Sequence, residues 1–302
     1  MTLSVAKPVL FAPLLMFAIT LASASHSTSM TINTHGGKEV LQRCDDIQVS
    51  IDNRDAARGE DSLSLRSLSG TLRVAAPRNG GVQILGTDSR EVTVLACKAV
   101  AAREQDKLDD IKVSLTDGRL AVSGPSGDDW VVYLLVKAPK NAALEVQTNN
   151  GAIHLEDLHG QVDATSENGP ISVKNCGGTL RAKTENGPID FSGSSSGDLR
   201  LTTTNGPISV EPSGSRWTGG KVVARTENGP VSLKLSDDFQ SSFEVEASMH
   251  APMSCSAAQC EKARKTWDDD HRRVQFGGAE PALKATTENG PISIESSKGD
   301  DV

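Results

Sequence analysis

Thr184-Glu185-Asn186-Gly187-Pro188-Ile189 is the stretch that decides the fold, because close copies of it occur six times in the 302-residue chain. Every copy is centred on an Asn-Gly step, found at Asn150-Gly151, Asn168-Gly169, Asn186-Gly187, Asn205-Gly206, Asn228-Gly229 and Asn289-Gly290. The first five copies follow one another at short, nearly constant intervals, and a much longer interval separates the fifth from the sixth. A period near 20 with a turn signal at a fixed place is typical of a solenoid with stacked coils.

The residues around the step repeat as well. Six positions before the Asn stand Leu144, Val162, Leu180, Leu199, Val222 and Leu283, and three positions after it stand Ile153, Ile171, Ile189, Ile208, Val231 and Ile292. Apolar residues that alternate with polar ones predict strands with one buried face. Each coil is therefore predicted to be a strand, an Asn-Gly corner, a second strand and a Gly-led return. We assign the Asn-Gly pairs as structural turns, because both residues tolerate positive φ.

An antiparallel arrangement is the rival interpretation, because Asn-Gly is also a favoured two-residue hairpin turn. Against it, equivalent positions such as Val162 and Leu180 carry similar side chains in every copy. Like residues lie over like residues in parallel coils, so the pattern favours a solenoid over a meander or sandwich.

The chain divides into four parts by composition. Residues 1–24 resemble an export signal, with Lys7, an apolar run over 9–21 and the small residues 22–24. That run is shorter than the roughly 20 residues that span a bilayer, so no membrane span is expected after cleavage. Residues 25–60 are expected to form a polar lead or N-terminal cap, and residues 61–302 the solenoid. Within it, residues 237–281 form an insertion, expected to be partly helical at 257–267 and to cover the solenoid; a short helix is also expected at 99–109.

Five cysteines follow the predicted signal, and disulfides are the default in an exported chain. Cys255 and Cys260 close a short loop and are the predicted pair. Cys44 with Cys97 follows by elimination. This leaves Cys176 as the free thiol.

The composition excludes several classes of partner. A formal net charge of −8 argues against nucleic acid and anionic membrane surfaces, which need basic footprints. Aromatic residues make up only 3% of the chain, too few for a long glycan-stacking groove. No cofactor is expected.

The leading strand that ends in Val136-Lys137-Ala138-Pro139 and the following Leu144–Gly151 stretch, with its serial copies, resemble the bacterial putative-adhesin β-solenoid family. The resemblance covers about residues 60–296. It implies an all-β, right-handed parallel β-solenoid in an exported or envelope protein, with one coil for each copy of the repeat. The family has no known function, and the resemblance implies no catalytic residue. The insertion departs from the family pattern.

Two sets of residues resemble metal sites. Glu167 and Glu185 would be adjacent like charges on neighbouring coils, which makes them weak candidates for a divalent cation. Lys183 and Arg225 lie on the same face, so a solvated, self-neutralising surface is the favoured interpretation. A zinc set of His250, Cys255, Cys260 and His271 is disfavoured by its spacing and by the oxidising compartment.

No catalytic set is recognised. Asp190 is a lone carboxylate among serines, and Asp163 is explained by ion pairing with Arg181. The Gly-x-Ser-x-Gly pattern at 193–197 lies in a return loop without the strand-to-helix context it needs. We therefore predict a non-catalytic, exported, adhesin-like scaffold in the periplasm or outside the cell. A polysaccharide-active β-helix enzyme, a lyase or glycoside hydrolase, is the alternative.

The expected partners are an unknown protein or an envelope polymer. Self-association through the open edge of the last coil is a further expectation, unless the insertion covers that edge.

Overall fold

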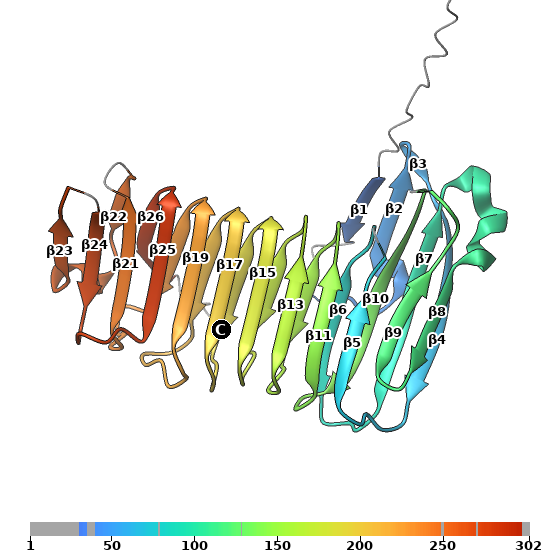
Figure 1. Cartoon of the computed structure of the whole chain (residues 1–302), viewed down its shortest axis with the longest axis horizontal. Helices are drawn as coiled ribbons and strands as arrows, with labels where there is room; N and C mark the ends of the chain where they lie inside the picture. The colour runs from blue at the N-terminus through green and yellow to red at the C-terminus, as the bar shows by residue number, and fades with distance from the viewer. Residues whose placement is uncertain are drawn as a thin grey trace, which may run out of the picture.

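The computed structural model describes residues 30–34, 40–77, 79–127, 129–248, 251–269 and 271–297. The predicted export signal, residues 1–24, lies outside these ranges. The described chain forms two long sheets and a small third one, and Figure 1 shows the long sheets running along a rod.

The strands of the twelve-stranded sheet are, in spatial order, β23 (Arg264–Trp267), β24 (His271–Phe276), β21 (Phe243–Ser248), β25 (Leu283–Asn289), β19 (Val222–Asn228), β17 (Leu199–Asn205), β15 (Leu180–Asn186), β13 (Val162–Ser166), β11 (Ala143–Thr148), β5 (Thr71–Ala75), β9 (Arg119–Ser123) and β8 (Lys112–Thr116). Those of the eleven-stranded sheet are β22 (Met253–Cys255), β26 (Ile292–Ser296), β20 (Val231–Leu235), β18 (Ile208–Pro212), β16 (Ile189–Gly193), β14 (Ile171–Lys174), β12 (Ile153–Glu156), β6 (Val82–Thr87), β10 (Trp130–Pro139), β7 (Val92–Val100) and β4 (Ala57–Leu65). The third sheet contains β1 (Met30–Thr34), β2 (Ile47–Ile51) and β3 (Arg54–Asp55).

Parallel pairing in equal register confirms the predicted solenoid. Leu144 lies opposite Val162, which lies opposite Leu180, and Ile153 lies opposite Ile171 in the other sheet. Each coil contributes one strand to each long sheet, as β15 and β16 do. The antiparallel alternative is therefore wrong for the six copies.

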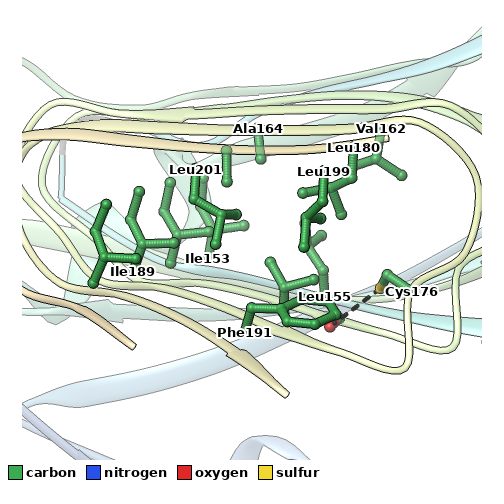
Figure 2. Packing of buried hydrophobic residues seen from close by; sticks show 14 of the residues in the cluster. Ile153, Leu155, Val162, Ala164, Cys176, Leu180, Ile189, Phe191, Leu199 and Leu201 are labelled. Atoms are coloured by element: carbon green, nitrogen blue, oxygen red, sulfur yellow. Dashed lines mark hydrogen bonds between the residues drawn. The ribbon is translucent and has the colours of Figure 1, made fainter. Parts of the chain in front are cut away.

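The apolar columns fill the space between the two sheets. Leu180, Ile189 and Phe191 are at most 1% exposed, and Figure 2 shows side chains from successive coils stacked in rows. Burying a side chain of this size stabilises the fold by about 1.5–3 kcal/mol. One coil alone cannot bury its inner face, so each depends on its neighbours.

The Asn residues of the corners form a continuous ladder. Each Asn donates from Nδ2 to Oδ1 of the Asn one coil earlier, for example Asn186 to Asn168 at 2.8 Å and Asn205 to Asn186 at 2.9 Å. The ladder runs through Asn79, Asn150, Asn168, Asn186, Asn205, Asn228 and Asn289. Asn79 belongs to an earlier, less regular coil made by β5 and β6. Stacked amides explain why Asn recurs at this position.

The corner glycines are required by close stacking and not by positive φ, which corrects the reason predicted from the sequence. None of the six repeat corners has positive φ, neither at Asn nor at Gly. A Cβ on Gly187 would instead lie 2.3 Å from the carbonyl oxygen of Gly169, one coil earlier. The same contact recurs at Gly206 and Gly229, at 2.0 and 2.1 Å. The coils approach so closely at the corner that no side chain fits.

A second ladder lies inside the corner. The buried hydroxyl of Thr203 donates to the carbonyl oxygen of Gly187 at 3.0 Å, and Thr184, Thr226 and Thr287 make the equivalent bond. A buried carbonyl left without its donor costs about 1–3 kcal/mol.

Replacing Thr203 by Val should therefore lower the free energy of unfolding by about 1–3 kcal/mol, because Val keeps the volume and removes the donor. Urea unfolding measures this. Thr202→Val on the outward side of the same strand is the matched control and should change stability by less than about 0.5 kcal/mol. Equal effects of the two substitutions would contradict a role for the ladder.

Both ends of the solenoid depart from chain order. β9 and β10 pair in parallel with β5 and β6 and lie beyond them, although they follow them in sequence. At the other end β21 and β22 of the insertion pair in parallel with β25 and β26, so the insertion stacks beyond the sixth copy. At one end of the solenoid lie β4, β7 and β8, which pair in antiparallel fashion, and at the other end lies the antiparallel hairpin β24–β23.

Two helix predictions need correction. The stretch expected to be helical at 257–267 contains only a 3-10 helix, η4 (Ala258–Glu261), and then strand β23. Tertiary pairing with β24 overrides the local preference there. The helix expected at 99–109 is a 3-10 helix, η3 (Ala102–Asp110), which starts later because β7 continues to Val100 in its pairing with β10.

Candidate functional site

The N-terminal segment of residues 40–55 covers the outer face of the eleven-stranded sheet and forms a second, small core there. Leu41 and Ile47 of the segment are buried against Cys97 of β7 and Leu135 of β10. Tyr133 and Leu95 pack around them. The predicted boundary at residue 60 falls inside β4.

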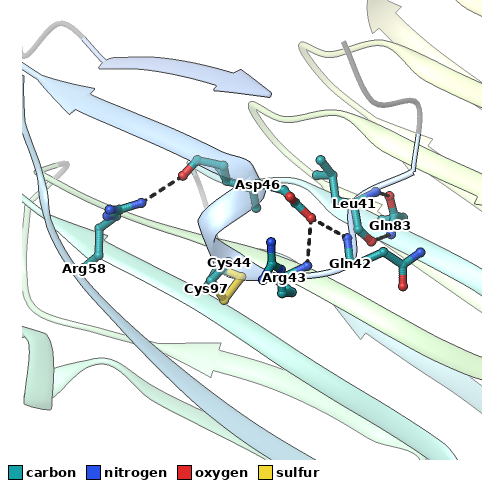
Figure 3. The surroundings of a disulfide bond; sticks show 9 residues. Leu41, Gln42, Arg43, Cys44, Asp46, Arg58, Gln83 and Cys97 are labelled. Carbon is teal, nitrogen blue, oxygen red and sulfur yellow. Dashed lines mark hydrogen bonds between the residues drawn. A yellow bond between two sulfur atoms is a disulfide. The ribbon is translucent and has the colours of Figure 1, made fainter. Parts of the chain in front are cut away.

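Several bonds fix this segment, as Figure 3 shows. The Cys44–Cys97 disulfide is present, as predicted. The Gln83 side chain accepts from the Leu41 N–H and donates to the Leu41 carbonyl, both at 2.8 Å. The 3-10 helix η2 (Cys44–Asp46) follows, and the Asp46 carboxylate accepts from the N–H groups of Gln42 and Arg43. These bonds hold residues 40–55 in place over the outer face of the eleven-stranded sheet, and we call this segment the roof.

The roof leaves two hollows beside it. The first has a volume of about 420 Å³ and lies near the disulfide, between roof residues 44–49 and residues 58–60 of β4. The second, of about 440 Å³, lies beside Leu41 and residues 62–64 of β4. Both extend over β7 and β10. Volumes of this size are typical of small-molecule sites.

Tyr133 lines the first hollow, and burial raises its pKa to about 12. The phenol therefore stays neutral at physiological pH and keeps its proton as a hydrogen-bond donor. Its hydroxyl makes no hydrogen bond within the described part of the chain.

The C-terminal end carries the second predicted disulfide, Cys255–Cys260, which is present. Those two sulfur atoms are therefore not thiolate ligands for the zinc set that the sequence disfavours. Of its histidines, His250 lies outside the described residues, and His271 faces Glu246 at 3.7 Å. Nearby, Trp267 of the edge strand β23 is 57% exposed, with the Arg272 guanidinium 5.8 Å from its ring centre.

The column of Glu167 and Glu185 is exposed, and Glu167 accepts from Nδ2 of Asn149 at 3.1 Å. In the same column Glu288 pairs with Arg225. On the other sheet Glu156 pairs with Lys174 at 3.8 Å and Glu211 with Lys234 at 3.9 Å. No group of three or more His, Cys, Asp or Glu side chains that could hold a metal occurs within the described ranges.

Asp190 and Asp163 lie in different sheets and do not converge. Asp190 stands between Ser172 and Ser209 on the neighbouring strands, and burial raises its pKa while Lys234 opposes the shift. Asp163 lies opposite Arg181. The Gly-x-Ser-x-Gly segment lies in the return between β16 and β17, where the Ser195 hydroxyl donates to the Gly197 carbonyl.

Cys176 is the free thiol, as predicted, and it is buried. Its Sγ donates to the carbonyl oxygens of Leu155 and Lys174 (Figure 2 shows the first contact). Burial raises its pKa to about 12.

The thiolate is the reactive form of cysteine, and the raised pKa keeps Cys176 protonated well above pH 8. Native protein should therefore fail to react with a disulfide reagent such as DTNB at pH 8, whereas guanidinium-unfolded protein should release close to one equivalent. Rapid stoichiometric reaction of the native protein would show that the thiol is accessible.

The chain is a parallel β-solenoid with antiparallel strands at both ends, and residues 40–55 cover the outer face of its eleven-stranded sheet near one of these ends. The sequence profile of the family described as Toastrack DUF4097 matches residues 19–300, and the chain belongs to that family. A comparison with curated proteins finds no match. No helix among the described residues is both long and apolar enough to cross a membrane.

Three solved bacterial structures are similar to this chain over much of its length. A putative cell adhesion protein from Clostridium sporogenes is 11% identical, covers 80% of this chain and 100% of its own, and has a TM-score of 0.33. A putative adhesin from Bacteroides fragilis is 9% identical over 79% and 97% of the two chains, with a TM-score of 0.26. One from Parabacteroides merdae is 9% identical over 79% and 96%, with a TM-score of 0.31.

Proposed function

We propose that this protein is an exported, non-catalytic, adhesin-like scaffold that contacts envelope or cell-surface macromolecules. The observation that carries the proposal is the filled interior. Columns such as Leu180 and Ile189 occupy the space between the sheets coil after coil, so recognition is left to the outer faces and the two ends. The repeats of this Toastrack family member also resemble those of the bacterial putative-adhesin β-solenoids, and that resemblance supports the same assignment.

The C-terminal end is the favoured contact surface. Trp267 is the most exposed large apolar side chain of the described residues, and exposed Trp residues are common at the centre of interfaces. It stands on β23, which has a single strand partner within the described part of the chain.

Co-sedimentation of the purified protein with isolated bacterial envelopes tests the proposal. We expect saturable binding that Trp267→Ala weakens about tenfold, in line with loss of an aromatic contact residue. Thr165→Ala, on the outer face of β13, is the control and should bind like the parent protein. No saturable binding to any envelope fraction would contradict the scaffold function.

The enzyme alternative is tested separately, by incubating the protein with acidic and neutral polysaccharides. We expect no depolymerisation. Activity that is lost in Asp190→Asn or Asp163→Asn would replace the scaffold proposal with a catalytic one.

A further inference from the structure

We propose that Asn289, the last residue of the amide ladder, is a site of spontaneous modification, where the side-chain amide is lost and aspartate and isoaspartate form. The reaction needs only water, and it does not depend on envelope binding. Asn-Gly steps favour it, because glycine leaves the attacking backbone nitrogen unhindered. The repeats contain six such steps, and the structure restrains them unequally.

The chemistry sets two requirements. The backbone nitrogen of Gly290 loses its proton to solvent and attacks Cγ of Asn289, so a C–N bond closes a succinimide ring while the Cγ–Nδ2 bond breaks and Nδ2 leaves as ammonia. Water then adds to either ring carbonyl, which gives aspartate from one and isoaspartate from the other; nothing is oxidised or reduced. The amide must therefore turn toward the next nitrogen, and that nitrogen must be free to give up its proton.

The first restraint is the amide ladder, which holds each interior Asn from both sides. Asn186 donates to Asn168 at 2.8 Å and accepts from Asn205 at 2.9 Å. Asn289 donates to Asn228 at 3.0 Å, but its own Oδ1 accepts no hydrogen bond within the described part of the chain. Its exposed amide is therefore held from one side only and is open to water.

The second restraint acts on the attacking nitrogen. At three interior corners the glycine N–H donates at 3.1 Å to the backbone carbonyl of the Asn one coil later, namely from Gly187 to Asn205, from Gly206 to Asn228 and from Gly229 to Asn289. Among the described residues the Gly290 N–H has no such acceptor, and the pairing of β25 with β21 already ends at Thr287. Both the amide and the nitrogen are thus less restrained at the last corner.

The other end of the ladder is restrained in a different way. Asn79 is followed by Gly80, which is buried and donates from its N–H to the carbonyl of Asn150 at 3.4 Å. A Cβ on Gly80 would lie 2.0 Å from the carbonyl oxygen of Val132, so β10 covers this corner closely. Position at the end of the ladder is therefore not enough, and Asn289 is the corner that lacks both restraints.

The chain offers an internal control in Asn186. Residues 184–189 and 287–292 have the same sequence, Thr-Glu-Asn-Gly-Pro-Ile, so the two sites should react at the same rate in the unfolded chain. Any difference in the native protein then comes from the fold. The product also changes the corner, because isoaspartate lengthens the backbone at the residue whose carbonyl accepts from Gly229.

Mass spectrometry of the full chain after incubation at pH 8 tests the proposal, with an unincubated sample as the zero point. Trypsin releases the two sites on separate peptides, residues 184–200 and 285–298. In native protein we expect Asn289 to lose its amide at least about tenfold faster than Asn186, because two hydrogen bonds that restrain Asn186 are missing at Asn289. In guanidinium the two rates should be equal. Equal native rates, a faster reaction at Asn186, or no native reaction at Asn289 while the unfolded chain reacts would each overturn the proposal.

Asn228→Ala tests the ladder as the source of protection. It removes the donor to Oδ1 of Asn205 and leaves the backbone bond from Gly206 to residue 228 in place. Amide loss at Asn205 should become about threefold faster or more, whereas Asn186 keeps both ladder neighbours and should not change. An unchanged rate at Asn205 would overturn the protective role of the ladder. If circular dichroism shows that this variant does not fold, the comparison of Asn289 with Asn186 in the parent protein decides.

Discussion

A variant that lacks residues 240–280 is expected to self-associate, and to form larger oligomers in solution than the full chain does. The deletion removes β21, β22 and the β24–β23 hairpin, which together cover the last coil. It uncovers the hydrogen-bonding edges of β25 and β26 and the core side chains Leu283 and Ile292, which are at most 3% exposed in the full chain. Strand edges with unpaired N–H and C=O groups, next to newly exposed apolar side chains, pair readily with other strands.

The remaining coils should still form in this variant. The deletion shortens the long interval between Asn228 and Asn289 to a length within the range of the intervals between the other corner asparagines. β19 and β20 can therefore still be followed by β25 and β26 in the stack, as they are in the full chain. Circular dichroism should keep its strand signal. Multi-angle light scattering should show dimers or larger species.

The control is a second form of the deletion that also carries Thr286→Lys and Ser293→Lys. These positions face outward on β25 and β26, where added charge opposes edge pairing without entering the core. This form should return toward the monomer. A deletion variant that is monomeric without the lysines would show that the insertion has no covering role.

The sequence predicted the coils well because one physical requirement repeats in all six copies. Each needs an inward apolar residue such as Leu180 or Ile189, and any departure would leave a void shared by two neighbours. The order of the end coils could not be predicted in the same way. Nothing in the long interval between Asn228 and Asn289 shows that β21 stacks beyond β25 and not before it, because parallel pairing satisfies both orders.

The hollows under the roof also escaped prediction, although one signal was available. Residues 130–136 read Trp-Val-Val-Tyr-Leu-Leu-Val, an apolar run without alternation. Such a run indicates a strand covered on both faces. Tyr133 and Leu135 point to the face that the roof covers. The predicted Cys44–Cys97 pair did not by itself show that residues 40–55 cover this face. The two disulfides were predicted because the export signal expected at residues 1–24 makes disulfides the default, and because Cys255 and Cys260 close a short loop.

Gly187→Ala is expected to be among the most damaging single substitutions in the chain, and it separates the two explanations of the corner glycine. A Cβ there would lie 2.3 Å from the Gly169 oxygen and 2.7 Å from the Gly169 carbon, both backbone atoms that other coils hold in place. The stack must therefore open at this corner. We expect a loss of about 3 kcal/mol or more in the free energy of unfolding, at the upper end of the usual range for single substitutions, because the clash is with backbone atoms that cannot turn aside.

Two control glycines make the comparison decisive in urea unfolding. Gly70 has φ +92° and open space around its missing Cβ, so Gly70→Ala measures the cost of positive φ alone, about 1 kcal/mol. Gly278 has open space and no positive φ, so Gly278→Ala should change stability by less than about 0.5 kcal/mol. If Gly187→Ala costs no more than Gly70→Ala, contact between successive coils is not what requires glycine, and the close stack at the corners loses its energetic importance.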